Sequence, residues 1–299
     1  MRAAQLERAG LDGLRVVPRP DPVPRDGEVL VDVVASSINP VDVKTIGGTF
    51  GVPREDAPLS PGWDVAGVVV DANGTDLRVG TRVIGMSHQL SSGTGTWAER
   101  VALPRPALAP APRSIGLVEA ATLPLAGLTA LQSLAELALE PGQRLLVAGG
   151  SGAVGAIAVQ AAQARGVAVE VLVTARHRAR LASALGETAT HTHVRAIPTA
   201  TYDAVLDTYG AFVVDAVVDH GTYLSIATEA GPPPASPRPV RVVRHQVQND
   251  QNDLRELAEL ADRSVITTRL DSLWPLSDVR GAVSHVQAGG LDGKAVLVT

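Results

Sequence analysis

The feature that most constrains the fold is an apolar run that leads into a glycine-rich turn and then into a helix. Residues 145–148 form a short apolar segment typical of a buried strand, and from residue 154 to residue 162 apolar positions recur at helical spacing. A second apolar segment, residues 167–173, follows. This succession predicts a strand, a helix and a second strand parallel to the first, which together form a βαβ unit.

The turn of this unit has the spacing G-x-G-x-x-G. Glycine at these positions permits a tight turn, a close approach of the backbone to a pyrophosphate, and close packing of the helix on the sheet. The free N–H groups at the start of the helix would bind the phosphate, because the helix dipole favours an anion there. The alternative is a glycine-rich turn in an unrelated α/β protein. We expect six turn residues to contact a dinucleotide: Gly150, Ser151, Gly152, Ala153, Val154 and Gly155.

The residues after the second strand indicate which dinucleotide binds. A site that prefers NAD places an Asp or Glu at the end of this strand. Glu170 lies inside the strand instead, and the segment that begins at Thr174 and runs to residue 180 has three arginines and no carboxylate. Arg176 and Arg178 could pair with a 2′-phosphate through forked hydrogen bonds. We therefore expect NADPH. The alternative is that these arginines form a solvated first turn of the next helix.

The composition of the chain narrows down its cellular compartment and its possible binding partners. A chain of 299 residues is long enough for two domains, and no apolar run reaches the length of a membrane span. The first residues lack the pattern of a secretory signal. A net charge of −5 argues against a nucleic-acid surface. Cysteine is absent, which excludes disulfides and cysteine-ligated zinc and fits a cytoplasmic protein.

Nearly all of the positive charge is arginine. Lys44 and Lys294 are the lysines among 26 basic residues. With so much alanine, valine, proline and glycine, this bias suggests a GC-rich bacterial genome. Because lysine is so rare in this chain, each of the two lysines is noteworthy, although each could also be a solvated surface group.

The first hundred residues are predicted to be mostly β-structure with short glycine- and proline-rich turns, which is consistent with a partly open barrel. A short helix should begin at Pro40, because proline is favoured at the first helical position. We expect residues 86–92 to form a flexible loop. The expected strands lie within residues 14–17, 28–34, 59–70, 79–85 and 93–102.

From about residue 114 the pattern changes to alternating helices and strands. We assign residues 1–115 and 265–299 to one domain and residues 116–264 to a second, which contains the βαβ unit. The expected elements are a helix at 118–139 broken at Pro124, strands at 202–207 and 221–226, a proline-rich loop at 231–239, a helix at 252–262, and a helix followed by a strand within 276–299.

Seven segments of the chain, in order, match a known family. They are SSINPVDVK (36–44), PGWDVAG (61–67), GTWAE (95–99), LPLAGLTA (123–130), the turn at 148–155, LDT (206–208) and GKAVL (293–297). The chain resembles the zinc-independent medium-chain dehydrogenase/reductases, in the quinone-oxidoreductase-like and enoyl-reductase branch. The resemblance implies an α/β fold with a GroES-like, β-rich catalytic domain made from both chain ends, a Rossmann domain with a doubly wound parallel sheet, and an active site in the cleft.

The resemblance also implies roles for single residues. Asn39 should lie at the pocket floor near the nicotinamide or the substrate carbonyl, although an Asn before proline can also simply form a turn. Thr129 should contact the carboxamide side of the nicotinamide, and Tyr209 should approach its ribose. Phe50, Trp63 and His88 should line the substrate pocket.

The resemblance argues against a catalytic metal. In zinc-bearing relatives the segment that matches residues 61–64 reads Gly-His-Glu and supplies ligands, whereas Trp63 occupies the histidine position here. His191 and His193 are spaced like a ligand pair, but we expect no acidic partner near them and interpret them as ordinary residues.

Two departures from the family pattern bear on the chemistry. Related enoyl-thioester reductases use a tyrosine within the segment that matches residues 39–50, and here Phe50 is near that place. The proton would then come from water, from Lys44 or from His88, although Lys44 could also be an exposed helix residue. The segment 207–221 is also shorter than usual by about one helical turn.

These observations predict a metal-free NADPH-dependent reductase of a quinone, an enone or another α,β-unsaturated carbonyl. The composition suggests a biosynthetic substrate such as an aromatic polyketide intermediate. The alternative is a non-redox enzyme on the same scaffold, such as a cyclase, isomerase or dehydratase, and the missing tyrosine motivates it. Members of the family that the chain resembles are usually dimers, and C2 symmetry is the commonest symmetry of soluble oligomers. We therefore predict a homodimer.

Overall fold

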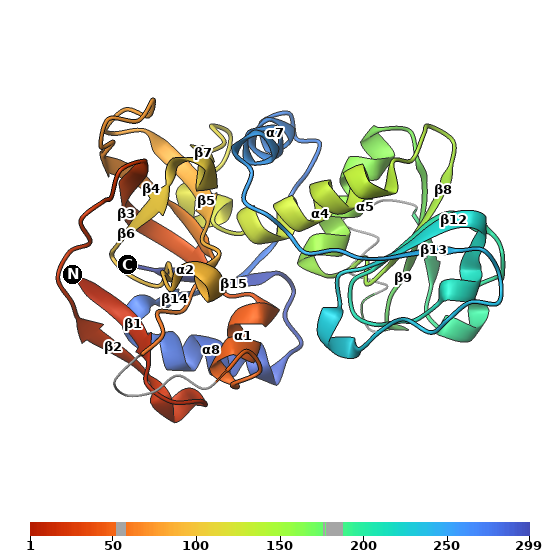
Figure 1. Ribbon diagram of the computed structural model, residues 1–299, viewed down its shortest axis with the longest axis horizontal. Coiled ribbons are helices and arrows are strands. Elements are labelled where there is room, and N and C mark those ends of the chain that lie inside the picture. The colour runs from red at the N-terminus through yellow and green to blue at the C-terminus, as the bar shows by residue number, and fades with distance from the viewer. Residues whose placement is uncertain (52–57, 176, 178–187) are drawn as a thin grey trace. The chain divides into compact units, whose positions relative to one another are not determined.

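The computed structural model describes residues 1–51, 58–175, 177 and 188–299 (Figure 1). The chain forms two compact units. The first contains Met1–Leu125, Gln248–Arg263 and Thr268–Thr299, and the second contains Ala126–Val247 and Ser264–Thr267. Residues 116–125 and 248–263, which the sequence analysis assigned to the second domain, therefore group with the first unit. Among the described residues, no helix is long and apolar enough to cross a membrane.

The first unit is built around a seven-stranded sheet, with a separate two-stranded β1–β2 ribbon. The order along the sheet is β14-β15-β3-β4-β5-β7, and β6 pairs with β3. All pairs are antiparallel except β14 with β15. Strand β3 pairs with three others and alternates buried and half-buried residues over most of its length, which agrees with the predicted half-buried strand. This is the GroES-like, β-rich domain that the sequence predicts.

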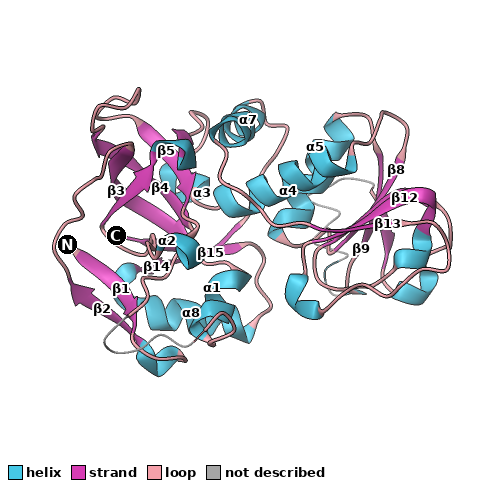
Figure 2. Cartoon of the chain, viewed as in Figure 1, coloured by secondary structure: helices cyan, strands magenta, loops and turns pink. Residues whose placement is uncertain are grey.

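The elements of the first unit include three further short helices as well as α7 and α8 (Figure 2). Their bounds are β1 Arg2–Leu6, β2 Leu14–Pro18, β3 Glu28–Ser37, α1 Pro40–Ile46, β4 Asp64–Asp71, β5 Arg82–Met86, α2 Gln89–Ser92, β6 Arg100–Pro104, β7 Leu108–Pro110, α3 Leu117–Ala120, α7 Gln251–Asp262, β14 Leu270–Pro275, α8 Val279–Ala288 and β15 Lys294–Val298.

The segment 86–92 corrects one expectation. It was predicted to be a flexible loop, but Met86 ends β5 and residues 89–92 form the short helix α2. Met86, Ser87 and Gln89 are all buried. The apolar side chain of Met86 and the backbone bond from Ser87 N to Trp63 O, 2.7 Å, hold the beginning of this segment in place, whereas residues 90–92 are exposed.

The second unit is a six-stranded parallel sheet in the order β10-β9-β8-β11-β12-β13. Numbered from β8, this is the strand order of a Rossmann fold, as predicted. Helix α5 packs on β8 and β9. The bounds are β8 Arg144–Ala148, α5 Ala153–Ala164, β9 Ala168–Leu172, β10 Ala189–His191, β11 Tyr202–Asp207, β12 Val217–Ser225 and β13 Arg241–Arg244, and α4 Pro124–Leu137 leads into this unit.

The shortened connection between β11 and β12 contains a single 3-10 turn, Val214–Ala216. The carboxylate of Asp207, at the end of β11, organises it. Its oxygens accept hydrogen bonds from the backbone N–H groups of residues 209, 210 and 212 at 2.9–3.1 Å, and from the Tyr223 hydroxyl. Asp207 is fully buried, so its charge satisfies the backbone groups that a helix would otherwise have paired.

We predict that Asp207→Asn lowers the free energy of unfolding of the second unit by about 2–3 kcal/mol, because a neutral amide cannot accept from four donors. Urea denaturation measures the effect. Asp219→Asn is the matched control: Asp219 is 58% exposed and pairs with Arg238, so its loss should change stability by less than about 0.5 kcal/mol. Equal stabilities of the two variants would contradict the prediction.

Candidate functional site

A buried carboxylate lies at the centre of the first unit. Asp64, the first residue of β4, is fully buried, and its Oδ2 accepts hydrogen bonds from the Ser37 hydroxyl, from Asn39 Nδ2 at 2.8 Å and from Lys294 Nζ at 2.7 Å. Its Oδ1 accepts from the backbone N of Leu125 at 2.7 Å, in the first turn of α4. An acidic side chain is favoured there by the helix dipole. Asp64 thus joins four segments of the chain.

Asn39 enters this cluster because of the way α1 begins. Pro40 occupies the first turn of α1, and Asn39 precedes it with extended backbone. The backbone N of Asn39 donates to Asp42 Oδ2 at 2.8 Å, which caps the helix. The Asn39 side chain is then directed to Asp64 and Lys294, with Lys294 Nζ 2.7 Å from Asn39 Oδ1. The predicted turn asparagine is therefore also a member of a buried polar cluster.

Asp42 is a second buried acid beside this cluster. Its Oδ1 is buried and has no hydrogen-bond partner among the described residues. Burial raises the pKa of Asp42 from 3.8 to about 7, against the lowering effect of the hydrogen bond from Asn39 N, and the charge of Asp64 raises it further. Near neutral pH this carboxyl is therefore close to half protonated.

The other residues proposed for catalysis or the substrate pocket differ in their burial. Lys44, in the last turn of α1, is half-buried. Phe50 is 41% exposed. Trp63 is buried with its indole N–H unpartnered among the described residues, and its ring lies 4.9 Å from that of His88. His88 Nδ1 is 3.0 Å from the Ser91 hydroxyl.

The glycine-rich turn of the second unit has the close packing that the sequence predicts. A Cβ on Gly150 would lie 2.6 Å from Val171 Cγ1, and a Cβ on Gly155 would overlap the carbonyl of Gly149. Gly149 has a φ of +91° and is one glycine of the turn that the motif did not single out. Gly152 precedes α5, and no side chain caps the helix there. The first N–H groups of α5 therefore suit an anionic ligand.

The remaining cofactor candidates lie in different surroundings. Thr129 is buried in α4. Thr174 is exposed, and its hydroxyl is 3.0 Å from His177 Nδ1. Tyr209 is 51% exposed, and burial of its hydroxyl, together with the charge of Asp207, raises its pKa. Arg176 and Arg178 lie outside the described residues.

Comparisons with known proteins agree with this fold. The family model for the alcohol dehydrogenase GroES-like domain matches residues 25–113, and that for the zinc-binding dehydrogenase matches residues 184–297. The structure of a quinone oxidoreductase from Coxiella burnetii is 25% identical with a TM-score of 0.86, and covers 100% of this chain and 99% of its own. The chain belongs to the medium-chain dehydrogenase/reductase superfamily.

Two further relatives of the chain carry information about cofactors. A mycobacterial protein solved in complex with NADPH is 27% identical with a TM-score of 0.85, and the match covers 100% of both chains. A chloroplastic NADPH-dependent alkenal/one oxidoreductase from Arabidopsis thaliana is 32% identical over 222 residues, which are 70% of this chain and 57% of the relative. The chain spans about half the length of the curated relatives that it matches.

The histidines of the second unit correct one interpretation. His191 was expected to lack an acidic partner, but its Nε2 lies 2.7 Å from Glu170 Oε2. Glu170 also binds Arg144 and the Tyr202 hydroxyl, both at 2.8 Å. The parallel pairing of β9 and β10 brings these residues together. In the described part of the chain, no three His, Asp or Glu side chains are grouped to hold a metal ion.

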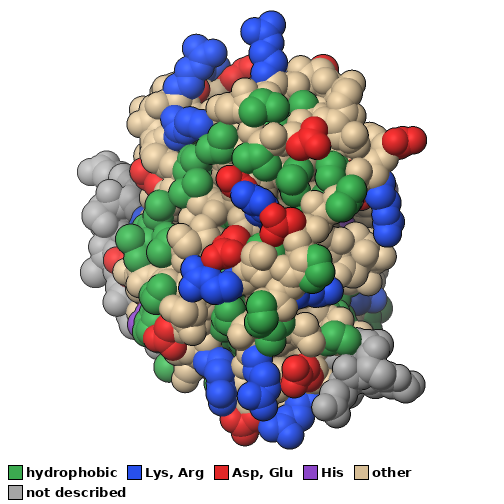
Figure 3. Space-filling model, turned by 90° about the vertical axis from the view of Figure 1, so that its left-hand side faces the viewer, with side chains coloured by type: hydrophobic (Ala, Val, Ile, Leu, Met, Phe, Trp, Pro, Cys, Tyr) green, Lys and Arg blue, Asp and Glu red, His purple; other side chains and the backbone are tan. Residues whose placement is uncertain are grey.

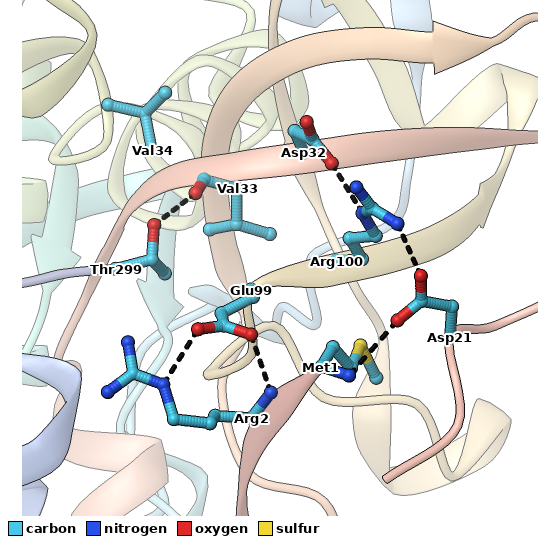
Figure 4. A pocket seen from close by; sticks show the side chains of 9 residues that line it. All are labelled: Met1, Arg2, Asp21, Asp32, Val33, Val34, Glu99, Arg100 and Thr299. Atoms are coloured by element: carbon cyan, nitrogen blue, oxygen red, sulfur yellow. Dashed lines mark hydrogen bonds and ion pairs between the residues drawn. The ribbon is translucent and has the colours of Figure 1, made fainter. Parts of the chain in front are cut away.

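A polar hollow of about 660 Å³ lies elsewhere in the first unit (Figure 4). Its charged groups pair with one another: Arg100 binds both Asp21 and Asp32, and Arg2 binds Glu99. None of the predicted site residues lines it. On the molecular face drawn in Figure 3, acidic and basic side chains are interspersed, so that face carries no large patch of one sign.

Sequence reasoning missed the centre of the buried cluster. Ser37, Asp64 and Lys294 were not proposed as site residues, although 36–44 and 61–67 were matched to the family and Lys294 was noted as one of two lysines. The rarity of lysine was the sequence feature that could have pointed to Lys294 as a site residue. The pairing itself joins residues 230 positions apart, and local patterns do not report such contacts.

We predict that ionisation of the Asp42 carboxyl lowers the free energy of unfolding as the pH rises. An acid with a higher pKa in the folded state binds its proton more tightly when folded, so the free energy of unfolding should fall by up to about 4 kcal/mol between about pH 4 and about pH 7. Asp42→Asn keeps an oxygen acceptor for Asn39 N and should remove this decline. Urea denaturation at acid and at neutral pH measures it.

The control for this experiment is Asp12→Asn. Asp12 is 82% exposed and pairs with Arg280 on the surface, so its replacement should leave the pH profile unchanged. A wild-type stability that is flat between these pH values, or an Asp42→Asn profile parallel to the wild type, would contradict the assigned pKa.

Proposed function

We propose that the protein is an NADPH-dependent, metal-free reductase of a quinone, an enone or another α,β-unsaturated carbonyl. The observation that carries the proposal is the turn at 149–155, where Gly149, Gly150 and Gly155 leave no room for side chains and α5 begins without a side-chain cap. The names of the relatives support the reaction class, because they include a quinone oxidoreductase and an NADPH-dependent alkenal/one oxidoreductase.

When bound, NADPH supplies a hydride, and the residues of this chain hold and polarise the acceptor. For an enone, the hydride forms a C–H bond at the β-carbon, the π electrons shift toward the carbonyl, and its oxygen gains the charge. A proton completes the reduction and NADP⁺ is released. Asn39 is proposed to donate its amide N–H to that oxygen, and Lys44, His88 or water to supply the proton. Phe50, Trp63 and His88 are proposed to line the substrate pocket.

The remaining proposed contacts are with the cofactor. Residues 150–155 would hold the pyrophosphate, with Thr129 near the carboxamide and Tyr209 near the ribose. Thr174, Arg176 and Arg178 would bind the 2′-phosphate region. The complex of the mycobacterial relative with NADPH supports the choice of cofactor.

We predict that NADPH binds at least tenfold more tightly than NADH, about 1.4 kcal/mol, and that Arg176→Ala removes the difference. Gly155→Val should abolish the binding of both, because its side chain would overlap the backbone of Gly149. Gly116→Val is the control, since a Cβ there meets no atom within 4 Å. Calorimetry measures all four proteins. Absence of nucleotide binding by the wild type would reject the reductase and favour the non-redox alternative.

The substrate class is tested by the oxidation of NADPH in the presence of quinones, alkenals, cyclic enones and aromatic polyketide-like enones. We expect turnover with conjugated acceptors and none with saturated ketones, because only the former can accept a hydride at a β-carbon. Tight NADPH binding without turnover of any acceptor would contradict the proposed reaction while leaving the cofactor site intact.

We also propose that the protein is a cytoplasmic homodimer. The lack of cysteine fits a reducing compartment. In the described sheet of the second unit, β13 is an edge strand, and edge strands offer unpaired backbone groups to a second copy. Val242 on β13 is 43% exposed.

We predict a dimer in sedimentation velocity that Val242→Asp converts to monomer, because a charge at the pairing edge opposes association. Val23→Asp is the control, since Val23 is 85% exposed in the first unit. A wild type that sediments as a monomer would contradict the proposed assembly.

A further inference from the structure

His88 is held in place by the residues on both sides of it in the chain. Ser87 and Gln89 are 1% and 0% exposed, whereas His88 between them is half-buried. The backbone N of Ser87 donates to Trp63 O at 2.7 Å, and the Trp63 ring lies 4.9 Å from the imidazole at an angle of 60°. The backbone and one side of the imidazole are therefore fixed, while part of the ring is open to solvent.

The Ser91 hydroxyl determines which ring nitrogen of His88 carries the proton. This hydroxyl donates to the backbone O of His88 at 3.0 Å, and its oxygen lies 3.0 Å from His88 Nδ1. A hydroxyl has one hydrogen, so the Ser91 oxygen can take part in the second contact only as an acceptor. Nδ1 therefore carries a proton in the neutral as well as in the charged imidazole, and Nε2 is the nitrogen that gains and loses one.

The Nε2 atom of His88 is available to another molecule. No described residue forms a hydrogen bond with it, and, unlike Nε2 of His245, it is not buried. Loss of its proton leaves both hydrogen bonds of Ser91 in place, because Nδ1 keeps its own proton. The side chain can thus release a proton at Nε2 and regain one from solvent without turning. Histidine is suited to such an exchange near neutral pH.

We propose that His88 is the proton donor of the reduction and that Ser91 is a positioning residue, which keeps Nε2 as the donating atom. The proposal rests on the proposed function for the identity of the substrate. Once the hydride has formed the C–H bond at the β-carbon of an enone, the Nε2–H bond of the imidazolium breaks. Its proton and the electron pair of the enolate C=C form the C–H bond at the α-carbon, and the carbonyl C=O is restored. The neutral imidazole then regains a proton from water.

The first test measures the reduction of an enone by the full chain over a range of pH. The side chains that contact the His88 ring, Trp63 and Ser91, do not ionise near neutral pH, and no described residue forms an ion pair with it. The kcat of the wild type should fall as the pH rises above neutral, because the acid form of His88 disappears.

His88→Gln should lower kcat by about 100-fold or more, which is the usual contribution of a general acid. The variant should also lose the dependence of kcat on pH and keep the wild-type affinity for NADPH. A His88→Gln protein whose kcat or pH profile matches that of the wild type would overturn the proposal.

Ser91 is tested by two substitutions. Ser91→Ala removes the acceptor of Nδ1–H and should lower kcat, whereas Ser91→Thr keeps a hydroxyl and should retain the wild-type kcat. In a His88→Gln background, Ser91→Ala should cause no further loss, because no imidazole remains to be positioned. Losses that multiply in the double variant would overturn the role of Ser91, since they would show that it acts independently of His88.

The tautomer is tested without turnover. The ring nitrogen chemical shifts of His88, measured by NMR at a pH where the imidazole is neutral, should show a protonated Nδ1 and an unprotonated Nε2. Ser91→Ala should lose this preference. An unprotonated Nδ1 in the wild type would overturn the proposed positioning of His88.

Ser92→Ala is the matched control. Ser92 belongs to the same short helix, α2, but its hydroxyl oxygen accepts from Thr94 N at 3.1 Å and does not contact the imidazole. This variant should keep the kcat, the pH profile and the His88 shifts of the wild type. The tests also separate the two proposals. A wild type that reduces no conjugated carbonyl would contradict the proposed function, whereas an active wild type with a fully active His88→Gln would contradict the role of His88 alone.

Discussion

The buried carboxylate of Asp64 is the interaction on which the first unit depends. It accepts four hydrogen bonds, which come from the end of β3, from the residue before α1, from the first turn of α4 and from the start of β15. A buried ion pair contributes little net stability by itself, but removal of one partner leaves an uncompensated charge and costs about 3–5 kcal/mol. The cluster therefore specifies how these four segments meet more than it adds to their stability.

The second unit uses a buried acid in a related way. Asp207 ends β11 and accepts from three backbone N–H groups and a tyrosine hydroxyl, and so orders a connection that contains no α-helix. Burial, reinforced by the charge of Asp207, raises the pKa of Tyr223, which keeps this hydroxyl protonated as a donor. In each unit a buried carboxylate thus orders the chain near a proposed binding region: Asp64 links regular elements, and Asp207 orders a connection that has no α-helix.

The sequence was informative where structure is local. The strand, turn and helix around Gly150 and the helix start at Pro40 were predicted because glycine spacing and proline placement act within a few residues. The flexible loop at 86–92 was predicted wrongly, because the burial of Gln89 depends on distant packing. The contact between His191 and Glu170 was missed for the same reason, since it depends on the register of β10 against β9.

The discontinuity of the first unit has a consequence for the order of folding during synthesis. Asp64 leaves the ribosome long before Lys294, and the whole span from Ala126 to Val247 is made between them. Domains generally fold as units while synthesis proceeds. The parallel sheet of the second unit can therefore form while the sheet of the first unit still lacks β15, and until then Asp64 has no ammonium partner. The buried acid of the first unit is thus paired with its lysine last, when the final strand enters the sheet.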